Sequence, residues 1–244
     1  MQQVRVRRAV SPLRRRFDTA PLALHRVDGL VAAARSEEPM HCLRPATVEA
    51  AARAFAAFPG EVLYAVKCNP EPGVLRALRA GGVRRFDCAS PAEVALVRQM
   101  FPEAAIHFMH PVKARGAIRE AFAQHGVRDF AFDSADELAK IRAEVAGTGV
   151  AGELGLILRL ALPRGPAVLD LSGKFGASPA EAATLLRAAC PLAGRLGISF
   201  HVGSQCLDPL AWRAALALVG QVIQTAGVTM DIVDAVSYTH LTLP

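Results

Sequence analysis

From about residue 60 onward, short apolar runs alternate with amphipathic stretches, and this alternation constrains the fold more than any other feature. Six amphipathic stretches have the apolar spacing of helices and lie near 72–80, 91–100, 113–125, 135–146, 178–193 and 208–226. Seven apolar runs are typical of strands and occupy residues 62–66, 84–89, 105–110, 129–133, 154–160, 198–203 and 230–234. Strands and helices in alternation form βαβ crossovers, so the sequence predicts a parallel sheet buried on both faces.

Three of the expected helices begin with the S-x-x-E pattern of a capping box. The pairs are Ser90 with Glu93, Ser134 with Glu137, and Ser178 with Glu181. The first two follow a strand almost directly. The third follows the longest connection, residues 161–177, which is rich in Gly and Pro. We expect that connection to be an excursion over one end of the sheet.

Seven strands of the βα type are one fewer than a closed eight-stranded barrel needs. An open doubly wound sheet is the alternative, but its Gly-rich fingerprint after the first strand is missing. Gly81 and Gly82 precede a strand and do not open a helix. The sequence therefore predicts an α/β fold, a TIM-type (β/α)8 barrel that is incomplete here with about seven strands.

The positive charge of the chain is concentrated at its N-terminus. Six arginines and no acid lie between Met1 and Phe17, and the remaining chain carries 22 basic and 22 acidic residues. A balanced body argues against a nucleic-acid surface over the fold. The arginine-rich segment is a solvated tail, a leader or an anion-binding arm. No apolar run approaches the ~18 residues of a membrane span, and five cysteines without C-x-x-C spacing indicate reduced thiols in the cytoplasm.

The expected organisation has three parts: a basic arm and lead-in over 1–38, a truncated barrel domain over 39–234, and a tail over 235–244. The tail is AVSYTHLTLP, which lacks the helix that should follow the last strand. We interpret the tail as non-native sequence. The barrel then lacks its eighth strand, and exposed sheet edges of this kind promote aggregation.

Polar residues gather where the expected strands end, which is where barrel enzymes place their chemistry. They are Lys67, Asp87 with Cys88, His110, Asp133, Arg159, and His201 with Ser204. Each has a structural alternative, such as a solvated strand end for Lys67, a turn for Asp133, and a plain loop for the HPVK segment containing His110 and Lys113. No metal-ligand spacing or nucleophile elbow is present. An amine beside acids suits a Schiff base with pyridoxal phosphate (PLP).

The motifs YAVKCNP, FDCASPAE, FMHPVK, FAFDSADEL, LSGKFGAS and SFHVGSQ, in this order, resemble the ornithine decarboxylase family, especially its bacterial ornithine/lysine branch. The resemblance extends over residues 39–234 and implies an alanine-racemase-like (fold type III) PLP-binding barrel. It also implies a separate C-terminal β-domain and a glycine-rich phosphate loop, and both are absent from this chain.

Carried over by position, the resemblance implies that Lys67 bonds covalently to PLP and that His201 stacks on the pyridine ring. It places Ser204 near the phosphate, Arg159 on the ring-nitrogen side, and Asp87 and Glu93 at the pocket wall.

The implied activity is decarboxylation of L-ornithine, and also of L-lysine, to a diamine such as putrescine for polyamine synthesis. The implied protein is a cytoplasmic homodimer that uses no metal, and this chain alone is expected to be inactive. Diaminopimelate decarboxylation and a non-catalytic regulatory homologue are the alternatives.

Overall fold

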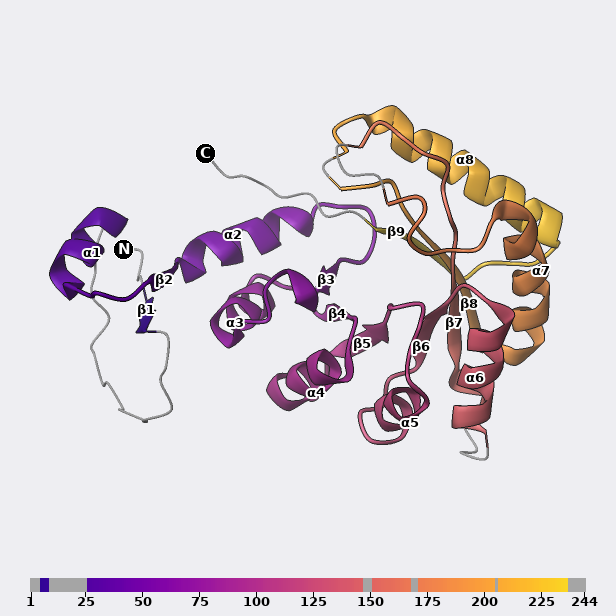
Figure 1. Ribbon diagram of the computed structural model, residues 1–244, viewed down its shortest axis with the longest axis horizontal. Coiled ribbons are helices and arrows are strands. Elements are labelled where there is room, and N and C mark those ends of the chain that lie inside the picture. Colours follow the sequence, from indigo (N-terminus) through magenta and orange to yellow (C-terminus); the bar gives the residue numbers. More distant parts are fainter. Residues whose placement is uncertain (1–4, 9–25, 147–150, 168–170, 205, 237–244) are drawn as a thin grey trace. The chain divides into compact units, whose positions relative to one another are not determined.

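A computed structural model describes residues 5–8, 26–146, 151–167, 171–204 and 206–236 (Figure 1). The chain divides into two compact units, Met1–Phe86 and Asp87–Pro244, and each is described by itself. Strands β3 to β9 follow one another in a seven-stranded sheet in the order of the sequence. This order is the one that βαβ crossovers produce, and it confirms the expected number of strands.

The first unit contains several elements that the alternation did not predict. Strand β1 pairs antiparallel with β2, and Arg5 lies opposite Leu43. Helices α1 and α2 are also new, whereas α3 has the expected bounds. The elements are β1 (Arg5–Arg8), α1 (Val27–Ala34), β2 (Met40–Leu43), α2 (Pro45–Phe55), β3 (Leu63–Ala65), the 3-10 turn η1 (Val66–Cys68) and α3 (Pro72–Ala80).

Strands and helices alternate in the second unit, as predicted. Its first strand, β4, begins two residues before the boundary between the two units. Its elements are β4 (Arg85–Cys88), α4 (Pro91–Met100), β5 (Ala105–Phe108), α5 (Arg115–Ala123), β6 (Asp129–Phe132), α6 (Ala135–Val145), η2 (Ala151–Glu153), β7 (Gly155–Arg159), α7 (Pro179–Ala189), η3 (Cys190–Leu192), β8 (Arg195–His201), α8 (Pro209–Ala226) and β9 (Ile232–Val236). Strands β5 to β9 pair in parallel. Helices α5 to α8 follow the outer side of these strands in Figure 1.

The three predicted capping boxes form to different degrees. At α7 the box is complete, because Ser178 accepts from the Glu181 N–H and Glu181 accepts from the Ser178 N–H. At α4 and α6 the serine accepts as expected. The glutamate side chains of these two helices bind other groups, and Glu137 of α6 is directed to lysines.

The last strand continues to Val236, two residues beyond the expected end of the barrel segment. Residues 237–244, the greater part of the proposed tail, lie outside the described residues. The boundaries at residues 38 and 234 stay predictions.

Alternate residues of β5 to β9 serve two different faces. In β5 to β8 the outward residues are buried apolar side chains that meet helices: Phe130 packs against Phe122 of α5, and Phe200 against Trp212 of α8, with ring centroids 6.4 and 6.2 Å apart. The residues between them face the other way and include the polar residues of these strands, such as Asp129, Ser199 and His201. Side-chain alternation along a strand thus separates a stabilising face from a chemical one.

Candidate cofactor site

A row of polar side chains crosses the inner face of the second unit. Strand register places Arg159 of β7 beside Ser199 of β8, and Ser199 beside Asp234 of β9. His201 lies two residues further along β8 on the same face, towards the carboxyl end of the strand. The register therefore brings together two residues predicted for the site, Arg159 and His201, and adds Ser199 and Asp234.

In this row, burial and nearby positive charge have opposite effects on the pKa of the acid. Burial raises the pKa of the Asp234 carboxyl, and the nearby positive charges of Arg159 and His107 act against that rise. Ser199 is 1% exposed, and its Oγ has no hydrogen-bond partner among the described residues. A buried hydroxyl without a partner can form a hydrogen bond with a polar group of a ligand on the inner face.

The ring of His201 is held in one orientation. Its Nδ1 accepts a hydrogen bond of 2.9 Å from the backbone N–H of Gly203, so the neutral ring carries its proton on Nε2. Gly203 has φ of +99°, a left-handed conformation that glycine adopts without steric strain. The glycine turn and the buried imidazole lie together at the end of β8, and the half-buried Ser204 follows directly.

Asp87 and Glu93 lie on either side of the turn between β4 and α4. Asp87 is half-buried on β4, between the fully buried Phe86 and Cys88. Burial raises the pKa of the Cys88 thiol, and the neighbouring acids add to this effect, so the thiol stays protonated. The Glu93 carboxylate accepts from the Ala89 N–H at 2.8 Å and from Ser90 Oγ at 3.1 Å. Glu93 thus closes the turn that follows Asp87.

Lys67 belongs to the first unit, and the strand before it ends one residue earlier than expected. Strand β3 stops at Ala65, and Lys67 is an exposed residue in the 3-10 turn η1. Below it, the Tyr64 hydroxyl donates to the Asn69 carbonyl at 3.3 Å, and burial raises the pKa of Tyr64 to about 12. The turn presents the amine at the carboxyl end of a strand, as predicted.

Outside residues 168–170, which are not among the described residues, the connection after β7 lies at the carboxyl ends of the strands, as predicted. It starts from Leu160 and returns beside it at Ala177, whose N–H donates to the Arg159 carbonyl at 2.9 Å. One residue earlier, the Gly176 N–H donates to Asp133 Oδ2 at 3.0 Å. We call residues 171–177 the strap. Asp133, which the sequence left open as a turn residue, anchors the strap beside Arg159.

Sequence reasoning missed a second polar cluster on the same inner face. Asp129 at the start of β6 binds His107 Nδ1 at 3.0 Å and Arg195 Nη2 at 2.7 Å. Gly155 on β7 makes room for this carboxylate, because a Cβ there would lie 1.9 Å from Asp129 Oδ1. The only available signal was the acid that opens the run DFAFD, and its partners are remote in sequence.

Other kinds of site find no support in the described part of the chain. Its His, Cys, Asp and Glu residues form no group of three that could hold a metal ion. None of its helices is both long and apolar enough to cross a membrane.

Comparison with known proteins decides the family. A family model described as pyridoxal-dependent decarboxylase, pyridoxal binding domain, matches residues 45–235. The chain belongs to this family. The pyridoxal-binding domain is similar to ornithine decarboxylase of Panagrellus redivivus, with 41% identity over 155 residues, which are 63% of this chain and 34% of that protein. It is 38% identical over 169 residues to lysine/ornithine decarboxylase of Selenomonas ruminantium, covering 68% of this chain and 40% of that protein.

Solved structures agree on the fold. Arginine decarboxylase of Paramecium bursaria Chlorella virus superposes with a TM-score of 0.75 at 29% identity, over 89% of this chain and 59% of that one. Lysine/ornithine decarboxylase of Vibrio vulnificus, solved with putrescine, gives 0.64 at 30% identity, over 82% and 54%. These likenesses confirm the predicted decarboxylase barrel. The pyridoxal-binding domain spans about a third to two fifths of the length of the curated relatives it matches.

Proposed function

We propose that this chain is the cofactor-binding part of a PLP-dependent decarboxylase that converts L-ornithine, and also L-lysine, to the diamine and CO₂. One observation carries the proposal: a family of pyridoxal-dependent decarboxylases matches the segment whose inner face bears Arg159, Ser199, Asp234 and His201. The names of the most similar relatives favour ornithine. The expected homodimer and cytoplasmic location belong to the same proposal.

The residues present fit PLP. A Schiff base needs an accessible lysine amine, and Lys67 is exposed at the carboxyl end of β3. A planar cofactor ring needs a flat partner with fixed tilt, and the His201 ring is held by Gly203. Bound PLP would supply an electron sink for the pair left behind when the α-carboxylate departs as CO₂.

The remaining predicted residues have roles that their surroundings support. The Arg159 guanidinium would face the ring-nitrogen side, with Asp234 as its neighbour across β8. Ser204 directly follows the Gly203 turn, and its hydroxyl would bond near the phosphate. Asp87 would line the pocket, and Glu93 would keep its strand end in place through the Ala89 N–H.

Covalent capture of the cofactor tests the proposal. The purified chain is incubated with PLP, reduced with borohydride and digested, and the modified lysine is found by mass spectrometry. We expect modification at Lys67, lost in Lys67→Arg and retained in the control Lys140→Arg. Equal labelling of many lysines, with no preference for Lys67, would count against the proposal.

Substrate choice needs the longer protein that carries this domain. Release of CO₂ from L-ornithine, L-lysine and diaminopimelate separates the three decarboxylases. Specific PLP capture without CO₂ release from any of them would favour the non-catalytic homologue.

A further inference from the structure

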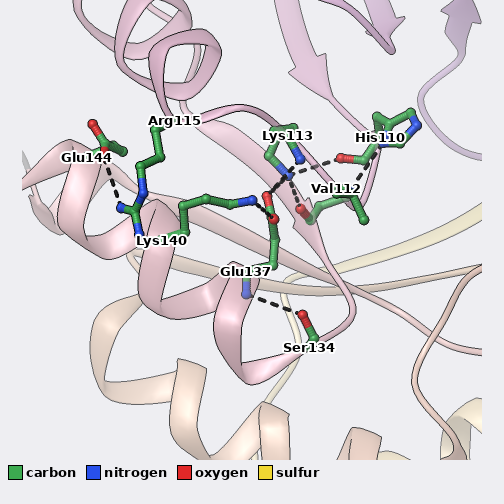
Figure 2. Close-up of polar contacts among 9 residues, drawn as sticks. His110, Val112, Lys113, Arg115, Ser134, Glu137, Lys140 and Glu144 are labelled. Carbon is green, nitrogen blue, oxygen red and sulfur yellow. Dashed lines mark hydrogen bonds and ion pairs between the residues drawn. The ribbon is translucent and has the colours of Figure 1, made fainter.

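Lys113 is a fully buried lysine outside the site described above. Figure 2 shows its polar contacts. It lies in the HPVK loop after β5, which the sequence left open as a pocket rim or a plain loop. Its Nζ donates to the Ala131 carbonyl at 2.5 Å and the His110 carbonyl at 3.0 Å, and pairs with Glu137 Oε1 at 2.9 Å. Three acceptors match the three N–H groups of an ammonium. The side chain is therefore held in one position.

The carboxylate of Glu137, the partner of Lys113, is also held by several contacts. Glu137 is 3% exposed and pairs with Lys113 through one oxygen and with Lys140 through the other, at 2.5 Å. The Lys113 backbone N–H also donates to Glu137 Oε1 at 3.2 Å. This explains why Glu137 does not complete the capping box of α6. Lys113 joins the loop after β5, the backbone of β6 and the first turn of α6.

His110 connects this cluster to the strap. The His110 carbonyl is held by Lys113, and its Nδ1 accepts from the Val112 N–H at 3.1 Å. With both ends fixed, the imidazole meets the ring of Phe175 edge-on, at a centroid distance of 5.2 Å. Phe175 is followed in the strap by Gly176 and Ala177, the residues bonded to Asp133 and to the Arg159 carbonyl.

A buried ion pair is weak support for stability, because apolar residues of similar volume often serve as well. An ammonium group adds directional hydrogen bonds, because each of its N–H groups binds one acceptor. Here two of the three acceptors are backbone carbonyls in separate segments. The arrangement suits the holding of a loop in one position.

We propose that Lys113 is a positioning residue: by fixing His110 it holds Phe175, and with it the strap, against the carboxyl ends of the strands beside Arg159. The contacts stand by themselves, and their value for PLP binding rests on the proposed function. A strap held in this way narrows access of water to the inner face next to Arg159. PLP bound there would be retained longer.

The test compares Lys113→Met with Lys140→Met, which removes the other cation from Glu137 and leaves the His110 carbonyl bonded. Hydrogen–deuterium exchange is followed at Gly176 and Ala177. We expect exchange at least about tenfold faster in Lys113→Met and little change in Lys140→Met. Unchanged exchange in a folded Lys113→Met would overturn the proposal.

A second variant covers the case in which Lys113→Met does not fold. His110→Ala removes the ring and keeps the ion pair, so the strap should loosen in a chain that still shows a cooperative urea transition. Unchanged strap exchange in His110→Ala would also overturn the proposal. PLP capture at Lys67 is measured in parallel: its absence in the wild-type chain refutes the proposed function, while the exchange result still decides the role of Lys113.

Discussion

Replacing Asp129 with asparagine should destabilise the second unit strongly while keeping the side-chain volume. The Asp129 carboxylate is 6% exposed and binds the 7% exposed His107 and the half-exposed Arg195. Asparagine keeps one oxygen as acceptor and brings a new NH₂ donor against groups that are themselves donors. The inner face would then contain a repulsive contact where a charge-assisted bond had been.

The magnitude follows from the two bonds. A buried hydrogen bond to a charged group contributes about 1.5–3 kcal/mol, so the loss of the His107 contact lies in that range. Because solvent screens Arg195, its contact contributes less than about 1 kcal/mol. We expect Asp129→Asn to lower the free energy of unfolding by about 2–4 kcal/mol, a large part of the ~5–15 kcal/mol of a typical domain.

Urea unfolding followed by fluorescence measures this change, because Trp212 is the one tryptophan of the chain and lies in the affected unit. The control is Glu153→Gln, which breaks the exposed pair with Arg128 and should change less than about 0.5 kcal/mol. A loss from Asp129→Asn no greater than that of the control would refute the reasoning.

The stability difference between wild type and Asp129→Asn should depend on pH. Burial raises the pKa of Asp129, but His107 and then Arg195 more than offset this, so the folded pKa lies below the usual value. The stabilisation is therefore complete above the unfolded pKa of about 3.9 and is lost as the pH falls through the folded pKa. We expect the difference between wild type and Asp129→Asn to shrink below about pH 4. A constant difference down to acid unfolding would contradict the assignment of the charge.

Three further outcomes are expected. Gly176 has φ of +108°, and a Cβ there would lie 2.5 Å from the Ala161 backbone nitrogen, so Gly176→Ala should cost about 1–3 kcal/mol, measured by thermal unfolding, and release the strap in hydrogen exchange. Ser178→Ala should cost about 1 kcal/mol in urea unfolding and Ser178→Gly only a few tenths, because Ser178 caps α7. Burial lowers the pKa of Lys113 to about 8 despite the nearby Glu137, so above that pH the unfolded chain binds more protons than the folded chain. The free energy of unfolding should therefore rise from about pH 8 to about pH 10.4. Lys113→Met should lack this rise.

Local signals determined how well each element could be predicted from the sequence. Helices α3 and α4 have the expected bounds because each begins with a proline directly after an N-cap residue, Glu71 or Ser90, whose side chain accepts from a backbone N–H. Strand β3 was expected to reach Val66 but ends at Ala65, where the chain enters a 3-10 turn that apolar periodicity does not distinguish from a strand. Helices α1 and α2 precede the first clear alternation, so no neighbouring pattern marked them.

The site shows the same limit. Strand ends predicted Arg159 and His201, but the row with Ser199 and Asp234 depends on sheet register, which no local pattern encodes. The S-x-x-E pattern at Ser134 predicted the serine cap correctly and assigned Glu137 wrongly. The competing partner Lys113 is 24 residues away in sequence, and only the folded chain brings the two together.

The alternation of faces along β8 limits how this domain can change in length. Ser199 and His201 face inward, while Ile198 and Phe200 alternate with them and belong to the fully buried apolar layer. Deleting one residue from the strand would turn Phe200 towards the polar row and drive His201 into the layer beneath α8. Point substitutions alter one face at a time, but a single-residue insertion or deletion exchanges the two. Length variation among natural variants should therefore be confined to the connections, with the strands keeping a constant residue count.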